Sequence, residues 1–270
     1  MVGMQTHISF TVRTLLLLLP LAVSVSVRGE NAHESLTPGE TLTYDVTWSV
    51  FHAGEVTGTL RSGGEGARDT YEVTTTARSE GVVSLLIDVN DELHSFFSPQ
   101  TLCSQRITKK INEGRRHKDT LIVFDYIRKL ALLDERDLSQ SGAPAKHAEN
   151  EIPPCVEDVV TAFYYLRRQH FEVGHTIELP VNDGSKTQRV VVEVQAREKV
   201  QTPLGTFDAF RVEPKVFNSL FKRKGRMLIW FSADDRQLPL RIKAMIAVGS
   251  ITGTLRSVSH PPPNVPPAKP

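Results

Sequence analysis

The chain has 270 residues, 40% of them hydrophobic, and its 32 lysines and arginines nearly balance its 31 aspartates and glutamates. Without residues 1–29, which hold two arginines and no acid, 30 basic residues face 31 acidic ones. Because nucleic-acid binding depends on an excess of positive charge, this balance excludes nucleic acid as an expected partner.

Residues 1–29 predict a secretory signal peptide. Arg13 precedes an apolar run over residues 15–23, and small residues alternate with valine after it. The run is shorter than the roughly 20 residues that a membrane span requires. We expect cleavage after Ser26 or Gly29. Because no cysteine lies at a cleavage site, no lipid-modified N-terminus is expected. The mature protein is expected to be soluble and periplasmic, without a transmembrane segment.

The stretch TLTYDVTWSV predicts a half-buried antiparallel strand. Apolar side chains alternate strictly with polar ones over ten residues, so that one face carries Leu42, Tyr44, Val46, Trp48 and Val50. The glycine of HAGE permits a turn, and VTGTLRS then returns along the first strand. This pattern indicates the start of a hairpin meander.

Further strand patterns follow along the chain, separated by the turn sequences NDGS, TPLG and ADDRQLP. We expect residues 30–258 to form a single β-rich domain. The proline-rich residues 259–270 are predicted to be a disordered, extended tail, because prolines cannot donate backbone hydrogen bonds.

The segment PPCVEDVVTAFYYLRRQHF breaks the strand pattern and predicts a long helix. Its apolar residues recur at helical spacing: Val156, Val159, Val160, Phe163 and Leu166. Acidic residues in the first turn and arginines near the last complement the helix dipole. A shorter helical turn is expected at VVSLLID. The predicted fold is therefore mainly β, a curved antiparallel sheet or an incomplete β-barrel or sandwich with one long covering helix.

The sequence offers little catalytic chemistry. The adjacent Asp234 and Asp235 of WFSADDRQLPLRI would point in different directions from a strand corner, so we interpret them as turn residues and not as an acid pair. NDGSKT lacks the upstream glycine of a nucleotide-binding loop, and no nucleophile elbow or metalloprotease motif is present. We expect no enzyme activity and no cofactor, with a hydrolase as a remote alternative because folding can assemble a triad from distant residues.

Two cysteines, Cys103 and Cys155, occur in a chain that is expected to enter an oxidising compartment. A disulfide between them is one prediction, and two buried thiols that never meet is the other. A metal site made of Cys155, His170 and His175 is disfavoured because no further nearby cysteine or histidine completes a ligand set.

Two basic clusters, at residues 114–118 and 222–226, are interpreted as solvated hairpin tips. Contact with anionic lipid headgroups is the alternative for both.

Four segments carry a resemblance to a known family, and they occur in the order GETLTYDVTWSVFHAGEVTGTL, VEDVVTAFYYLR, TPLGTFDAFRVEP and GRMLIWFSADDRQLPLRIKAMIAVGSITGTL. Over residues 39–255 the chain resembles a family of exported bacterial proteins, the domain of unknown function numbered 3108. The resemblance implies export but no activity, cofactor or catalytic residue. A tryptophan-to-proline pattern of the family matches Trp230, Ser232, Asp234 or Asp235, Arg236 and Pro239.

Two function classes remain. The first is a non-catalytic binding or carrier module, in which the curved sheet and its helix enclose a pocket for a lipid, another apolar ligand or a lipoprotein segment. The predicted pocket residues are Tyr44, Trp48, Val159 and Phe163. The second is a structural or assembly protein of the cell envelope, whose sheet edge or surface binds another protein.

Overall fold

The fold is taken from a computed structural model, which describes residues 36–63, 69–140, 142–215 and 225–260. The chain divides into two units, residues 1–32 and 33–270, and all described residues belong to the second. The predicted signal peptide, almost all of the proline-rich end and most of the basic cluster at 222–226 lie outside the described residues.

Fourteen strands form one antiparallel sheet in the described part of the chain. The first seven are β1 Thr41–Trp48, β2 Phe51–Ser62, β3 Tyr71–Ser79, β4 Asn90–Phe97, β5 Ser104–Glu113, β6 Arg116–Asp125 and β7 Leu130–Asp137. The other seven are β8 Lys146–Glu151, β9 Thr176–Asn182, β10 Thr187–Thr202, β11 Gly205–Pro214, β12 Arg226–Ser232, β13 Pro239–Met245 and β14 Ser250–Ser259. Two short helices accompany them, α1 Gly81–Ser84 and α2 Thr161–Leu166.

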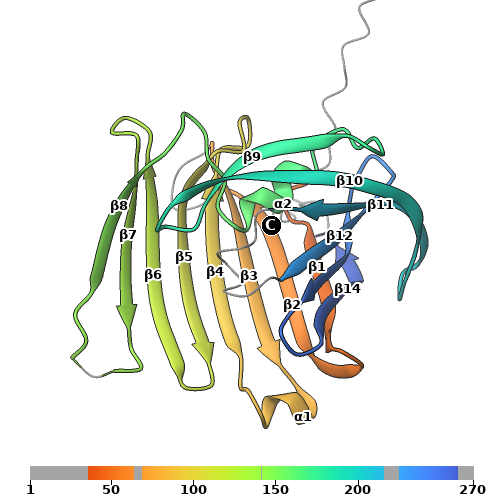
Figure 1. The fold of residues 1–270 in the computed structure, drawn as a ribbon, viewed down its shortest axis with the longest axis horizontal. Helices are drawn as coiled ribbons and strands as arrows, with labels where there is room; N and C mark the ends of the chain where they lie inside the picture. Colours follow the sequence, from red (N-terminus) through yellow and green to blue (C-terminus); the bar gives the residue numbers. More distant parts are fainter. Residues whose placement is uncertain (1–35, 64–68, 141, 216–224, 261–270) are drawn as a thin grey trace, which may run out of the picture. The chain divides into compact units, whose positions relative to one another are not determined.

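The sheet is a meander with one long-range pairing. Its strand order is β8-β7-β6-β5-β4-β3-β2-β1-β14-β13-β12-β11-β10-β9, so β1 pairs with β14 and the two edges are β8 and β9 (Figure 1). The alternation of β1 is seen in its burial, because Leu42 and Tyr44 turn to the core while Thr41 and Thr43 stay half-buried. The prediction of a mainly β, antiparallel, unclosed sheet is confirmed.

The two edge strands meet at one corner through side chains and not through a backbone ladder. Asn182 donates from Nδ2 to Asn150 Oδ1 at 2.6 Å, and Asn150 donates from Nδ2 to the Gly184 carbonyl at 2.9 Å. Gly184, at φ +96°, packs so closely that a Cβ there would lie 2.7 Å from Ile122 Cδ1. The β9–β10 turn is thereby seated on the inner face of β6.

The prediction of one long covering helix is wrong. The helix α2 has six residues, and the segment before it is extended: Glu157 N–H donates to the Pro180 carbonyl at 3.0 Å, and Asn182 N–H donates to the Glu157 carbonyl at 2.9 Å. Glu157 thus forms a parallel bridge with Val181 of β9. Since Glu157 satisfies its own N–H and carbonyl on β9, the helix does not extend back through it. The predicted turn at VVSLLID overlaps α1.

Candidate functional site: an apolar pocket beside α2

A cavity of about 430 Å³ lies between α2 and the inner side of β9, β10 and β12. Eleven of its thirteen lining residues are apolar, and the two polar ones are Asp183 and Gln188. Its volume falls in the range of roughly 300 to 1,000 Å³ that is typical of small-molecule sites. The cavity is therefore large enough and apolar enough to hold a hydrophobic ligand.

Two periodicities direct the apolar side chains into this space. Ala162 and Phe163 lie on the same side of α2 as Leu166, because they precede it by four and three residues. Val190 and Val192 are two apart on β10, so both point to the same side of the sheet. The cavity is walled by a helix face on one side and by strand faces on the other.

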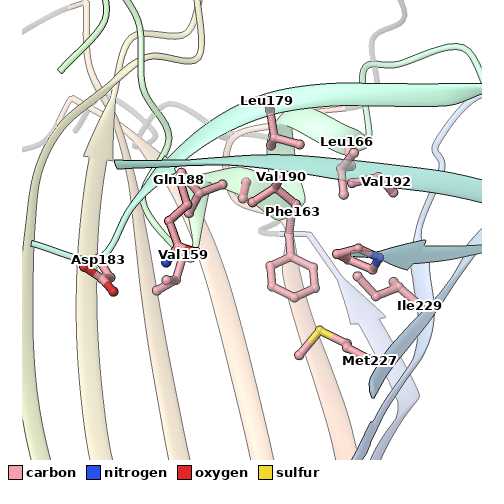
Figure 2. A pocket seen from close by; sticks show the side chains of 13 residues that line it. Val159, Phe163, Leu166, Leu179, Asp183, Gln188, Val190, Val192, Met227 and Ile229 are labelled. Carbon is pink, nitrogen blue, oxygen red and sulfur yellow. The ribbon is translucent and has the colours of Figure 1, made fainter. Parts of the chain in front are cut away.

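The pocket has an apolar end and a polar end. Figure 2 shows the Phe163 ring projecting away from α2 toward Met227, with Ile229 beside them. Asp183 and Gln188 lie at the opposite end of the group. A ligand in this pocket would meet hydrocarbon along most of its length and polar atoms at one end.

The four predicted pocket residues are not brought together. Val159 and Phe163 line the cavity, whereas Tyr44 is buried in a separate cluster with Leu240 and Leu255. That burial raises the pKa of the Tyr44 phenol above its usual range. Trp48 lies at the far end of β1, where its Nε1 donates to the Val248 carbonyl at 3.0 Å.

Other lining residues are not singled out by the sequence, among them Leu179, Val190, Met227 and Ile229. Their strand patterns are visible as QRVVVEVQAREKV and RMLIWFS. Alternation shows which residues share a face, but it does not show which strand faces α2, because that depends on long-range pairing.

A second hollow, of about 280 Å³, adjoins the polar end of the pocket, since Asp183 lines both. Its other lining groups include the basic side chains of Lys109, Arg116, Lys118 and Lys146. Lys118 is paired with Glu135 at 2.8 Å, whereas Lys109 makes no hydrogen bond or ion pair to a described side chain. Burial lowers the pKa of Lys109, and the smaller effect of nearby carboxylates, which raises the pKa, does not offset it.

The start of α2 is held by a fully buried carboxylate. Asp158 Oδ2 accepts hydrogen bonds from the hydroxyls of Ser95 at 2.6 Å, Ser104 at 2.9 Å and Thr161 at 3.0 Å. Asp158 Oδ1 accepts from the N–H groups of Val160 at 2.8 Å and Thr161 at 3.1 Å. These five bonds compensate for the burial of the charge and fix α2 against β4 and β5.

The end of α2 is held by a buried ion pair. Arg167 donates from Nη1 to Glu40 Oε1 at 2.6 Å and from Nη2 to Glu40 Oε2 at 3.0 Å. The guanidinium also lies 5.6 Å from the centre of the Tyr164 ring. Such a bidentate pair fixes orientation, so α2 is anchored at both ends.

Glu157 is also a buried acid, but its carboxyl group lacks the hydrogen bonds that Asp158 receives. Its side chain is 1% exposed, and its Oε2 has no hydrogen-bond partner among the described residues. Burial, with a smaller effect from neighbouring Asp158, raises the pKa of Glu157 to about 8. Burial therefore favours the protonated form of the carboxyl group at neutral pH.

The structure places the sulfurs of Cys103 and Cys155 at disulfide distance, 2.01 Å, with the two Cα atoms 5.1 Å apart. The bond joins the start of β5 to the segment before α2. Because the Cys155 sulfur is bonded to that of Cys103, it does not serve as a metal ligand together with His170 and His175. Within the described ranges, no three metal-ligating side chains come together.

Asp234 and Asp235 lie in the turn between β12 and β13. Asp234 Oδ1 accepts from the Ser232 hydroxyl at 2.6 Å, and Asp234 Oδ2 accepts from Arg236 Nη2 at 2.7 Å. These local bonds shape the turn, as expected for aspartate at such corners. Neither carboxylate lines the pocket.

No helix in the part of the chain that the structure describes is long and apolar enough to cross a membrane.

Comparison with known proteins gives a family and a fold. Residues 43–256 match the family described as Protein of unknown function (DUF3108). A β-barrel-like protein of the domain of unknown function DUF1849 from Brucella abortus is similar in structure, with a TM-score of 0.54 and 8% identity over 82% of this chain and 97% of that one. The hypothetical protein CT021 from Chlamydia trachomatis has a TM-score of 0.37 and 10% identity over 88% of this chain and 96% of its own. No curated protein matches the sequence.

Proposed function

We propose that this chain, which belongs to the DUF3108 family of proteins of unknown function, is a non-catalytic binding protein that carries an apolar ligand in the pocket beside α2. The observation that carries the proposal is the cavity of about 430 Å³, which is apolar apart from Asp183 and Gln188 at one end. Water in contact with such an apolar lining is unfavourable, so replacing it with the hydrocarbon part of a ligand would be favourable.

The ligand class that fits best is an acyl chain with a polar head. The hydrocarbon part would lie against Phe163, Met227 and Ile229. The head would lie at the polar end, where the basic side chains of the neighbouring hollow can attract an anionic group. A lipid or the acylated end of a lipoprotein has this chemistry. The proposal includes a periplasmic location, which rests on the signal-peptide features of residues 1–29.

A titration with fatty acids of several chain lengths, read by displacement of a hydrophobic fluorophore, tests the proposal. We expect saturable binding in the micromolar range. Ala162→Phe fills the cavity from α2 without adding charge, so it should abolish binding, and Phe163→Asp should weaken it by placing a carboxylate against the ligand. Ala145→Phe, which lies outside the pocket, is the matched control and should bind like the wild type.

Circular dichroism of each variant distinguishes loss of the site from loss of the fold. Weak binding by a variant supports the proposed site only if the circular dichroism spectrum of that variant matches the spectrum of the wild type. If the wild type binds no chain length saturably, the carrier function fails and the role of envelope assembly partner takes its place.

A further inference from the structure

Large hydrophobic side chains are exposed mainly at one end of the sheet, where they form what we call the apolar rim. Eight of the thirteen exposed large hydrophobic residues in the described ranges lie on three adjacent tips: Val50, Phe51, Val82, Leu85, Leu86, Ile87, Val248 and Ile251. Leu85 is 84% exposed. Scattered apolar residues on a surface are ordinary, but a contiguous group of this kind is typical of a binding surface.

Hydrogen bonds join the three tips into one surface. The β1–β2 tip touches the β13–β14 tip, because Ser49 N–H donates to the Ser250 carbonyl at 2.6 Å. The α1 segment touches β2, because Glu80 N–H donates to the Ala53 carbonyl at 2.8 Å and the Glu80 carboxylate lies 3.0 Å from His52 Nε2. Figure 1 shows α1 at the opposite end of the strands from α2.

A basic hairpin tip adjoins the rim. Gly114 N–H, in the β5–β6 turn, donates to the Asp88 carbonyl just after α1 at 2.7 Å. This turn carries the cluster at 114–118, in which Arg116 is paired with Glu113 at 2.8 Å. Arg115 is exposed and makes no ion pair with a described residue. Exposed leucines thus lie near the exposed guanidinium of Arg115.

We propose that the apolar rim and the 114–118 tip dock the protein on the surface of an anionic lipid bilayer. Projecting tips suit an interfacial contact, since their apolar side chains can enter the headgroup layer while the backbone stays outside. The adjacent arginine supplies attraction to negative headgroups. The exposed guanidinium of Arg115 beside the leucines favours an anionic lipid surface over an uncharged protein surface. The inference is independent of the pocket.

Flotation with vesicles tests the docking. We expect the purified protein to float with vesicles of phosphatidylethanolamine and phosphatidylglycerol, and less with vesicles of phosphatidylcholine alone. Leu85→Ser with Leu86→Ser should weaken partitioning on the order of tenfold per leucine, because each loses its burial in the interface. Arg115→Glu should weaken binding to the anionic vesicles by at least about fivefold and reduce its dependence on salt.

Ile127→Ser is the matched control, because Ile127 is 96% exposed but lies in the β6–β7 turn, away from the rim. It should float like the wild type. The proposal is overturned if the wild type does not float, or if the double leucine variant floats equally well. Sedimentation that shows self-association abolished by the leucine changes, without vesicle binding, would assign the rim to a second copy of the chain and would also overturn it.

Discussion

Glu157 is the residue whose surroundings fit its chemistry least well. Its backbone is satisfied by β9, but its carboxyl group is buried next to Asp158 and one oxygen has no hydrogen-bond partner in the described structure. The pKa of Glu157 is raised to about 8 for that reason. The sequence pattern places it in the first turn of a helix, where a charged carboxylate would be favourable, so the pattern does not reveal its neutral state.

Replacing Glu157 with glutamine should change how stability depends on pH. In the unfolded chain the carboxyl group ionises near its ordinary pKa of 4.5, whereas in the folded protein it stays protonated to about pH 8. The contribution of Glu157 to the stability of the wild type should therefore be greatest below pH 4.5. The unfolding free energy should then fall by about 1.4 kcal/mol per pH unit as the pH rises toward 8. Glutamine does not ionise, so Glu157→Gln should remove this loss.

Urea unfolding at pH 5 and pH 8 measures the effect as the difference between wild type and variant. We expect that difference to favour the variant by a few kcal/mol more at pH 8 than at pH 5. Glu149→Gln, at an exposed position on β8, serves as the control and should leave the pH dependence unchanged. Parallel pH curves for wild type and Glu157→Gln would contradict the assignment of a buried neutral acid.

The strands are largely predictable as elements, and α2 is not. Alternation is a local property, so TLTYDVTWSV and the turn sequences identify β1 and the hairpins without knowledge of the rest of the chain. The spacing of Val156, Val159 and Phe163 suggests one helical face, but Val156 packs in a cluster with β6 and β7 residues while Phe163 packs beside the pocket. The extended part of the segment is set by its long-range bridge to Val181, which periodicity cannot reveal.

The pairing of Cys103 with Cys155, which links β5 to the segment before α2, can be tested by counting free thiols. We expect Cys103 and Cys155 to be bonded, so that denatured, unreduced protein shows no free thiols. The two residues are 52 apart in the sequence. In the chain-entropy model, closing such a loop is worth roughly 3 to 4 kcal/mol, and Cys103→Ser with Cys155→Ser should lower the unfolding free energy by about that amount. Two reactive thiols per chain would show that the bond is absent.

At the level of the whole molecule, the proposed carrier function depends on an unclosed sheet and on a helix that does not fill the space beside it. The mainly β, unclosed sheet is predictable, since many strands separated by turns favour such folds. Half of the expected site, Val159 and Phe163, lies at the pocket, whereas Tyr44 and Trp48 lie elsewhere. The register that brings β10 and β12 opposite α2 connects residues far apart in the sequence, so no local pattern contains it.

The proposal that the pocket beside α2 holds an apolar ligand is tested most directly by a crystal structure. The protein would be crystallised with a fatty acid brominated along its chain, and the anomalous signal of bromine would locate the chain. The proposal predicts a bromine peak inside the cavity, between Phe163 on one side and Val190 and Ile229 on the other. The carboxylate should lie in the basic hollow, closer to Lys109 than to the like-charged Asp183. A cavity closed by its own side chains, or bromine peaks only outside it, would contradict the claim that this pocket carries an apolar ligand.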